Sequence, residues 1–154
     1  MDINWTIATF ENLSLRELHD LIKLRIDVFV VEQTCPYPEL DGLDSLSSTL
    51  HIHGKVDDRL VAYARALAPT ATSSTAKIGR VVTDSDYRHK GLARQMLGRL
   101  ITKVEQSWPT AELKLSSQTQ VTQLYRSLGF VPISEEYIED GIAHIDMQRP
   151  ARSP

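Results

Sequence analysis

The sequence predicts one α/β domain in which a mixed β-sheet of about seven strands is flanked by helices. The chain has 154 residues, of which 42% are hydrophobic and 24% charged, and this suits a soluble domain with a sizeable core. Short apolar runs typical of strands recur between amphipathic helical stretches. Some runs are joined by tight turns and others by helices, so antiparallel and parallel pairs should share the sheet.

The chain is expected to begin with a strand, a helix and a long loop. Residues 5–10 have the pattern of a short strand, and Ser14 with Glu17 has the spacing of a capping box, which opens a helix. An apolar face at helical spacing carries this helix to about Glu32. The loop that follows, TCPYPELDGLDS, contains two prolines and a glycine, and long loops in compact domains are often functional.

Three β runs are expected next. Residues 49–56 and 60–67 are separated by a short polar turn, which predicts a hairpin. Residues 76–83, AKIGRVVT, form the third run after a small polar loop.

The second half of the chain predicts two helices and three further β runs. Apolar residues share one helical face over 91–106, and residues 111–116 alternate as a strand. A short helix over 120–130 is closed by a glycine that suits a left-handed cap. The last two β runs, 131–138 and 142–149, flank the turn EDG. One domain is therefore expected over residues 1–150, followed by a frayed tail at 151–154.

Composition argues against several classes of protein. A formal net charge of −3 gives no reason to expect nucleic acid or an anionic membrane as a partner. The single cysteine, Cys35, excludes an internal disulfide and suits a cytoplasmic protein. Neither a membrane-spanning run nor a signal peptide is recognisable, and the histidines lack metal-ligand spacing, so no metal is expected. The sequence leaves open whether the protein is a monomer or a homodimer.

A cluster of cations lies between the third β run and the 91–106 helix. A helix N-terminus reached from a strand presents unpaired N–H groups and the positive end of the helix dipole, which favours an anion. Arg88, His89, Lys90 and Arg94 would add charge, and Gly91 would let a ligand approach the backbone. The alternative is that these cations are simply solvated. The segment has neither the P-loop nor the dinucleotide-binding glycine pattern.

The spacing Arg88-x-x-Gly91-x-Ala93 resembles the pyrophosphate-binding motif of the GCN5-related N-acetyltransferase (GNAT) superfamily. The stretch LYRSLGF, about thirty residues later, resembles the short tyrosine-bearing helix and Gly-Phe of that superfamily. The segments LRIDVFVVEQTCPYPELDGLD, VAYARAL and DGIAHIDM resemble its ElaA-like subgroup. The resemblance covers nearly the whole chain. It implies a single-domain acyl-CoA N-acyltransferase fold whose central parallel strands, 76–83 and 111–116, are splayed apart.

The resemblance further implies acetyl-CoA as co-substrate. Its pantetheine arm would take the place of a strand between the splayed pair, and its pyrophosphate would bind at the N-terminus of the 91–106 helix, which we call the helix mouth. Gln118 lies where the family often has an asparagine that touches the cofactor. The implied cofactor-binding residues are Val81, Val82, Thr83, Arg88, His89, Lys90, Gly91, Leu92, Ala93, Arg94 and Gln118.

The implied chemistry is attack of an amine on a thioester carbonyl. A backbone N–H at Val82 or Thr83 would stabilise the oxyanion, and Tyr125 would protonate or hydrogen-bond the departing thiolate. The alternative makes Tyr125 a core aromatic with a satisfied hydroxyl. Because an alkyl ammonium has a pKa near 10.4, only roughly one molecule in two thousand is neutral at pH 7, and a general base is useful.

Three residues are candidates for that base. Glu32 ends the first helix, although a structural cap or ion pair is the competing interpretation. His51 lies in the second β run, where the competing interpretation is exposed polar surface. His144, in the last β run, is a weaker candidate of the same kind.

Charged residues near the long loop allow two roles. Arg25, Arg65 and Arg80 lie among apolar neighbours, so each needs an acidic partner, for which Asp27, Glu32 and Asp41 are available. The loop carboxylates Glu39, Asp41 and Asp44 would form an acidic lip that attracts a cationic amine.

Taken together, these patterns predict an N-acetyltransferase that moves an acetyl group from acetyl-CoA to a primary amine by direct attack in a ternary complex. The acceptor would be a small molecule or a peptide. A catalytically silent acyl-CoA-binding module is one alternative. Acyl-homoserine lactone synthesis is another, because LRIDVFVVEQ also resembles the start of such synthases, although these lack the LYRSLGF type of ending.

Overall fold

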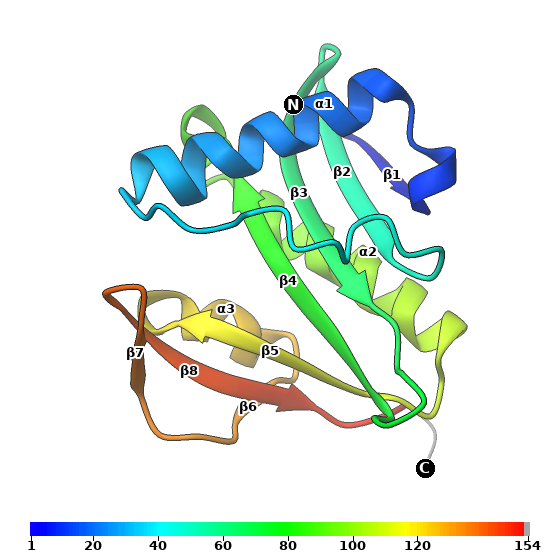
Figure 1. Ribbon diagram of the computed structural model, residues 1–154, viewed down its shortest axis with the longest axis vertical. Helices are drawn as coiled ribbons and strands as arrows, with labels where there is room; N and C mark the ends of the chain where they lie inside the picture. The colour runs from blue at the N-terminus through cyan, green and yellow to red at the C-terminus, as the bar shows by residue number, and fades with distance from the viewer. Residues whose placement is uncertain (153–154) are drawn as a thin grey trace.

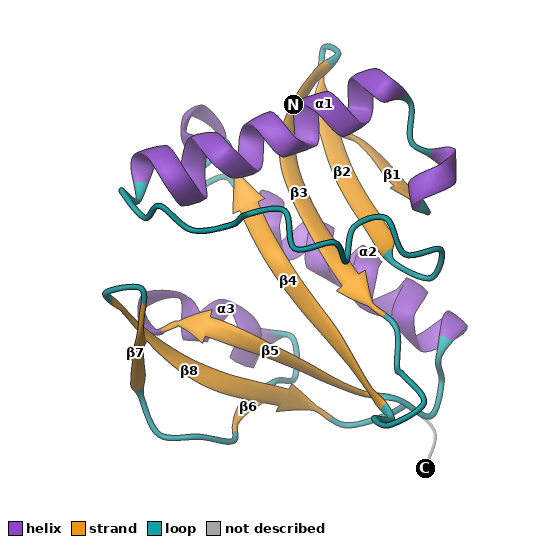
Figure 2. Ribbon diagram, in the orientation of Figure 1, coloured by secondary structure: helices purple, strands orange, loops and turns teal. Residues whose placement is uncertain are grey.

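The computed structural model describes residues 1–152 and shows one mixed eight-stranded sheet with helices on both faces (Figures 1 and 2). The strand order is β1-β2-β3-β4-β5-β8-β6, and β7 also pairs with β8. The strands are Asn4–Ala8 (β1), Leu50–Val56 (β2), Arg59–Leu67 (β3), Thr75–Thr83 (β4), Glu112–Gln118 (β5), Val131–Pro132 (β6), Tyr137–Glu139 (β7) and Ile142–Arg149 (β8).

Three α-helices and several tighter or wider turns complete the chain. They are Leu15–Arg25 (α1), Leu92–Ser107 (α2), Thr122–Ser127 (α3), the π-helical segment Ile26–Glu32 (η2), and the 3-10 turns Phe10–Asn12 (η1), Ser85–Tyr87 (η3) and Thr119–Val121 (η4). No helix within residues 1–152 combines the length and the apolar character needed to cross a bilayer.

The local signals in the sequence act as expected at α1 and at the first hairpin. The Glu17 amide donates to Ser14 Oγ at 3.0 Å, and the Ser14 amide donates to Glu17 Oε1 at 2.9 Å, which completes the capping box. The β2–β3 hairpin turns through Asp57 and Asp58, which both have positive φ, as a type I′ hairpin turn requires.

The sheet lies between α1 on one face and α2 on the other (Figure 1). Buried residues of α1 and η2 pack against β3 and β4 in a smaller core made of Leu21, Leu24, Val28, Leu60, Tyr63 and Val82. The larger core packs the apolar stripe of α2, including the fully buried Met96 and Leu100, against β2 to β5.

The parallel strands β4 and β5 separate after three residue pairs. Thr75, Ala76 and Lys77 pair with Glu112, Leu113 and Lys114, and no pair follows. From Ile78 onward β4 continues along β3, whereas β5 continues along β8 (Figure 1). The edge of β4 that faces β5 therefore has no strand partner over its C-terminal half, which confirms the predicted splay.

The end of the chain differs from the prediction. The run expected at 131–138 is divided into β6 and β7, so the sheet has eight strands where about seven were expected. Pro132 has no N–H to donate and ends β6. Beyond it the Ile133 amide still donates to the Asp146 carbonyl at 2.9 Å, but the Asp146 amide donates to the Ser134 hydroxyl, so a side chain takes the place of a backbone acceptor there. Residues 153 and 154 of the tail predicted to fray lie outside the described residues.

Candidate active site

A cleft of about 660 Å³ lies where β4 and β5 part, and we call it the β4–β5 cleft. Its walls come from η2, the loop after η2, the C-terminal half of β4, the start of α2, β5, η4, α3, the β7–β8 turn and the start of β8. The lining residues are Val28, Phe29, Glu32, Gln33, Cys35, Tyr37, Ile78, Gly79, Arg80, Val81, Val82, Thr83, Arg88, Ala93, Leu115, Ser116, Gln118, Gln120, Val121, Leu124, Tyr125, Glu139, Asp140, Ile142 and His144.

The N-terminus of α2 presents unpaired amides at one end of this cleft. Gly91 takes the left-handed N-cap position with φ 79°, and no side chain caps the helix. His89 also has a positive φ of 62°, and such left-handed turns of backbone form anion-binding concavities. Within residues 1–152, no protein oxygen accepts from the amides of residues 89–94. These amides are therefore free to bind an anion, with the helix dipole adding to the attraction.

Two of the predicted cations already have partners. The Arg88 guanidinium lies 2.8 Å from the Glu32 carboxylate and donates to the Thr83 carbonyl at 3.2 Å. Arg94 donates to Ser127 Oγ of α3. His89 and Lys90 are exposed. The side chains of Arg88 and Arg94 thus connect the N-terminus of α2 to η2, β4 and α3, while the backbone N–H groups there have no partner.

Six of the eleven predicted cofactor residues line the cleft and five do not. Val81, Val82, Thr83, Arg88, Ala93 and Gln118 line the cleft. His89, Lys90, Gly91, Leu92 and Arg94 do not, and Leu92 is buried at 2% exposure, so its side chain belongs to the core. Gln118 Oε1 accepts from Gln120 Nε2 at 2.8 Å, which orients the amide in the wall.

Tyr125 lines the cleft from α3 and is 6% exposed. Its ring packs edge-on against Phe130 with centroids 6.0 Å apart. Burial raises the pKa of the Tyr125 hydroxyl to about 12. Within residues 1–152 this hydroxyl has no hydrogen-bond partner, in contrast with the alternative that expected a satisfied core tyrosine.

The two principal candidate bases are both engaged. Glu32 lines the cleft but pairs with Arg88. His51 is 0% exposed and does not line the cleft. Its Nδ1 lies 2.6 Å from the Tyr63 hydroxyl and its Nε2 lies 2.9 Å from the Asp44 carbonyl, so no ring nitrogen is free. Burial lowers the pKa of His51. The expectation that this strand histidine is exposed polar surface is wrong, because the long loop covers it.

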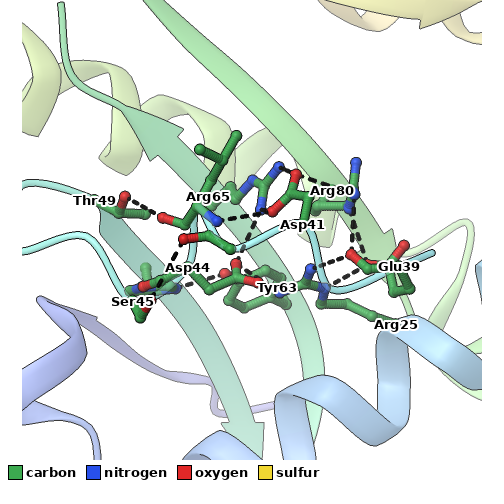
Figure 3. A network of polar contacts seen from close by, with 12 residues as sticks. Arg25, Glu39, Asp41, Asp44, Ser45, Thr49, Tyr63, Arg65 and Arg80 are labelled. Carbon is green, nitrogen blue, oxygen red and sulfur yellow. Dashed lines mark hydrogen bonds and ion pairs between the residues drawn. The ribbon is translucent and has the colours of Figure 1, made fainter. Parts of the chain in front are cut away.

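The long loop is held by a buried network of ion pairs (Figure 3). Arg25 Nε donates to Glu39 Oε2 at 2.6 Å, and Arg25 Nη1 donates to Asp44 Oδ1 at 2.8 Å. Arg65 binds Asp41 at 2.6 Å and Asp44 at 3.0 Å, and Arg80 binds Glu39 at 2.9 Å. The arginines therefore have acidic partners as expected, but only Asp41 among the three partners predicted for them takes part.

The predicted acidic lip is wrong. Glu39 and Asp44 are 4% and 8% exposed and are bound to arginines, so they present no negative edge to solvent. The hydrogen bond from Arg65 holds the pKa of Asp41 below its usual range. Burial opposes ionisation of Asp44, yet the bonds and charges of Arg25 and Arg65 outweigh it and lower its pKa. In this network three carboxylates face three guanidiniums, so their formal charges balance.

Several cleft residues were absent from the predicted site. Tyr37 lines the cleft from the loop, and its hydroxyl donates to Glu39 Oε1 at 2.5 Å. The central carbon of the Arg80 guanidinium lies 5.7 Å from the centre of the Tyr37 ring. Glu139 and Asp140 enter from the β7–β8 turn and are exposed. Ile142 was also absent, and the one available signal for it was strand alternation, which places it on the same face of β8 as the weaker candidate base His144.

Comparison with known proteins identifies the family. The sequence model of the GNAT acetyltransferase domain family matches residues 28–150, which is most of the chain. The splayed parallel strands and the uncapped helix mouth are consistent with that match. The chain therefore belongs to the GNAT acetyltransferase family, and its fold is that of the acyl-CoA N-acyltransferases.

Within this family the chain is ElaA-like. It is 38% identical over 147 residues to the ElaA protein of Escherichia coli, covering 96% of both chains. The crystal structure of Escherichia coli ElaA superposes with a TM-score of 0.91 at 37% identity, covering 96% of this chain and 99% of that one. An acyl-CoA N-acyltransferase from Pseudomonas aeruginosa gives a TM-score of 0.90 at 41% identity, with the same coverage.

Proposed function

We propose that this protein transfers an acetyl group from acetyl-CoA to a primary amine by direct attack in a ternary complex. The observation that carries the proposal is the β4–β5 cleft, which leads from the unpaired amides of the α2 mouth to the unpartnered hydroxyl of Tyr125. An extended donor with a phosphate-rich head and a reactive tail fits both ends of this path. The acceptor is a small molecule or a peptide. The single cysteine suits a reducing cytoplasm.

The backbone supplies most of the donor site. The amides of residues 89–94 would hold the pyrophosphate, since a helix N-terminus attracts phosphate without needing free side chains. The unpaired edge of β4 after Lys77 would hydrogen-bond the pantetheine arm as a missing strand would. Gln118, oriented by Gln120, would contact the same arm from the β5 side.

Tyr125 would act mainly as a hydrogen-bond donor to the leaving sulfur. Its pKa of about 12 exceeds the value near 8.5 typical of a thiol by roughly 3 to 4 pH units. Complete proton transfer to the thiolate would therefore cost about 5 kcal/mol, whereas a hydrogen bond stabilises the thiolate without that cost. The sulfur would take its proton from solvent after the bond to carbon has broken.

A silent acyl-CoA-binding module is the second candidate, and one observation favours it. Both principal candidate bases are held in structural contacts, Glu32 by Arg88 and His51 by Tyr63 and Asp44. Binding of acetyl-CoA without release of free thiol across a panel of amines would support this module. Thiol release that depends on the amine would support the transferase.

Two variants test the donor site itself. Gly91→Glu should abolish binding of acetyl-CoA in calorimetric titration, because it places a carboxylate where the pyrophosphate would lie. Gln106→Glu adds the same charge at the exposed far end of α2 and should bind normally. Normal binding by a folded Gly91→Glu variant would contradict the proposed donor site.

The third variant tests Tyr125. Tyr125→Phe keeps the ring that packs on Phe130, so it should lower kcat at least about tenfold with acetyl-CoA affinity nearly unchanged. Lost affinity with unchanged turnover would contradict a role at the leaving group.

A further inference from the structure

The proposed transfer needs a group that removes a proton from the acceptor, and this inference rests on that proposed function. An alkyl ammonium has no lone pair with which to attack the thioester, and at pH 7 only roughly one molecule in two thousand is neutral. Glu32 and His51 are engaged elsewhere. Among the described residues, the cleft is lined by one imidazole, that of His144.

His144 lies on the acceptor side of the β4–β5 cleft. It belongs to β8, where it pairs in register with Gln118 of β5 on one side and with Tyr137 of β7 on the other. Strand alternation puts its side chain on the same face as that of Ile142, and both line the cleft. The neighbouring Ile145 packs against the core on the opposite face. The imidazole is half-buried, so an acceptor in the cleft can reach it.

The hydrogen bonds of His144 leave a lone pair available. Its Nδ1 lies 2.7 Å from the Ile142 carbonyl oxygen. A carbonyl can only accept, so Nδ1 carries the proton and donates it. In the neutral ring the lone pair is then on Nε2, and within residues 1–152 Nε2 has no hydrogen-bond partner. This arrangement, in which one nitrogen is fixed and the other is open, is the one that a general base requires.

The ring of His144 is also held in place. It stacks on Tyr137 with centroids 6.0 Å apart and an interplanar angle of 21°. The Tyr137 hydroxyl donates to Asp146 Oδ1, and since it has only one proton, the Ser116 hydroxyl beside it must donate to Tyr137. The chain Ser116–Tyr137–Asp146 ties the stacking partner to both β5 and β8, which restricts rotation of the imidazole.

We infer that His144 Nε2 accepts the proton of the acceptor ammonium and so prepares the amine for attack on the thioester. One N–H bond of the ammonium breaks and an Nε2–H bond forms. The freed lone pair then bonds to the acyl carbon, the carbon–sulfur bond breaks, and the sulfur leaves with that electron pair. The nitrogen that has bonded to the acyl carbon is cationic, and it loses a second proton to solvent as the neutral amide forms. The imidazolium also returns its proton to solvent. Glu139 and Asp140, both in the cleft wall, favour a cationic acceptor.

Other titratable groups face the same space, and the test must separate them from His144. Burial raises the pKa of Tyr125 to about 12, and burial also raises the pKa values of Tyr137 and Cys35. Beside the ring lie Tyr137 from β7 and, bonded to it, Asp146 from β8. The other titratable or charged groups that line the cleft are Glu32, Cys35, Tyr37, Arg80, Arg88, Tyr125, Glu139 and Asp140.

The experiment compares two acceptors that differ in basicity. In His144→Gln, kcat/KM at pH 7 for a strongly basic alkylamine should fall about a hundredfold or more. For hydroxylamine, which is largely neutral at pH 7 and needs no base, kcat/KM should change less than about threefold. The loss with the alkylamine should shrink as the pH is raised toward about 10, because the amine is then neutral and needs no base, and acetyl-CoA affinity should be unchanged.

His19→Gln is the matched control, because His19 is exposed on α1 and bonds only to the adjacent Asp20. It should leave both acceptors and the pH profile unaltered. Retained activity with hydroxylamine shows that the His144→Gln site is folded. Equal losses for the two acceptors, or no loss with the alkylamine, would overturn the role of His144. A wild-type protein that binds acetyl-CoA but acetylates no amine would instead overturn the proposed function.

Discussion

Replacing Arg25 by methionine removes the most buried charge of the loop network. Arg25 is 0% exposed and bonds to Glu39 and Asp44, and its guanidinium lies 5.5 Å from the centre of the Tyr63 ring. Methionine retains an unbranched apolar chain of similar length, so the packing of the stem is largely preserved. The substitution therefore isolates the loss of the charge and its hydrogen bonds.

The magnitude follows from the charges that remain. Wild type has three guanidiniums facing three carboxylates, and the Arg25→Met variant has two facing three. One negative charge is then uncompensated in a largely buried site. Breaking a buried pair in this way typically costs about 3–5 kcal/mol. Against a total stability of about 5–15 kcal/mol for such a domain, the variant should lose a large share of its free energy of unfolding.

Urea denaturation measures the effect. With an m-value of about 2 kcal/mol/M, the midpoint should fall by roughly 1.5–2.5 M. Lys23→Met is the matched control on the same helix, since Lys23 forms an exposed ion pair with Asp27 and its loss should leave the midpoint nearly unchanged. A loss below about 1 kcal/mol in Arg25→Met would refute the reasoning that the network depends on charge balance.

The pH dependence gives a second check on the same variant. In wild type the pKa values of Asp41 and Asp44 are lowered by folding, which stabilises the protein at pH values above the pKa of a free carboxylate. This stabilisation is lost as the pH falls through the pKa values of the folded protein. The Arg25→Met variant should lose less stability than wild type as the pH is lowered, because its unpaired carboxylate is protonated more readily. Its deficit relative to wild type should therefore shrink as the pH is lowered.

Three further outcomes are expected from denaturation experiments. Gly91→Ala should destabilise the protein by about 1–2 kcal/mol because φ is 79° there, whereas Gly98→Ala, in the interior of α2 with open space around it, should stabilise it by up to about 1 kcal/mol. Leu100→Ala should cost about 2–5 kcal/mol, since Leu100 is fully buried. Burial lowers the pKa values of His51 and His53, so the unfolded chain binds protons at a higher pH than the folded protein. The melting temperature should therefore decrease as the pH is lowered from about 6.5.

Elements whose signals are local could be predicted from the sequence. The capping box at Ser14 and the apolar stripe of α2 specify their helices by residues a few positions apart, and both helices begin within one residue of the expected position. The division of 131–138 into β6 and β7 was not foreseen, because it depends on Ser134 reaching the Asp146 amide across the sheet. Alternation alone contains no information on that contact.

The candidate site shows the same limit. The helix mouth was recognisable because its residues are contiguous. The burial of His51 was not, because it depends on where the loop after η2 crosses the sheet and brings the Asp44 carbonyl to the ring. The arginines among apolar residues indicated that buried carboxylates exist, but the spacing did not identify Glu39 and Asp44 as those carboxylates.

Arg80 links the long loop to the backbone of β4. Between the pairs Tyr63–Val82 and Arg65–Gly79, β4 has one residue more than β3, which is a β-bulge, and Arg80 there has φ 56°. A non-glycine residue keeps such a conformation only when its surroundings hold it, and the Arg80 guanidinium bonds to the Glu39 carboxylate at 2.9 Å and to its carbonyl at 3.0 Å. The bulge directly precedes Val81 and Val82, whose edge faces the cleft. The loop therefore fixes the direction of the β4 backbone as well as one wall of the cleft, so a substitution at Glu39 should affect both sides of the site.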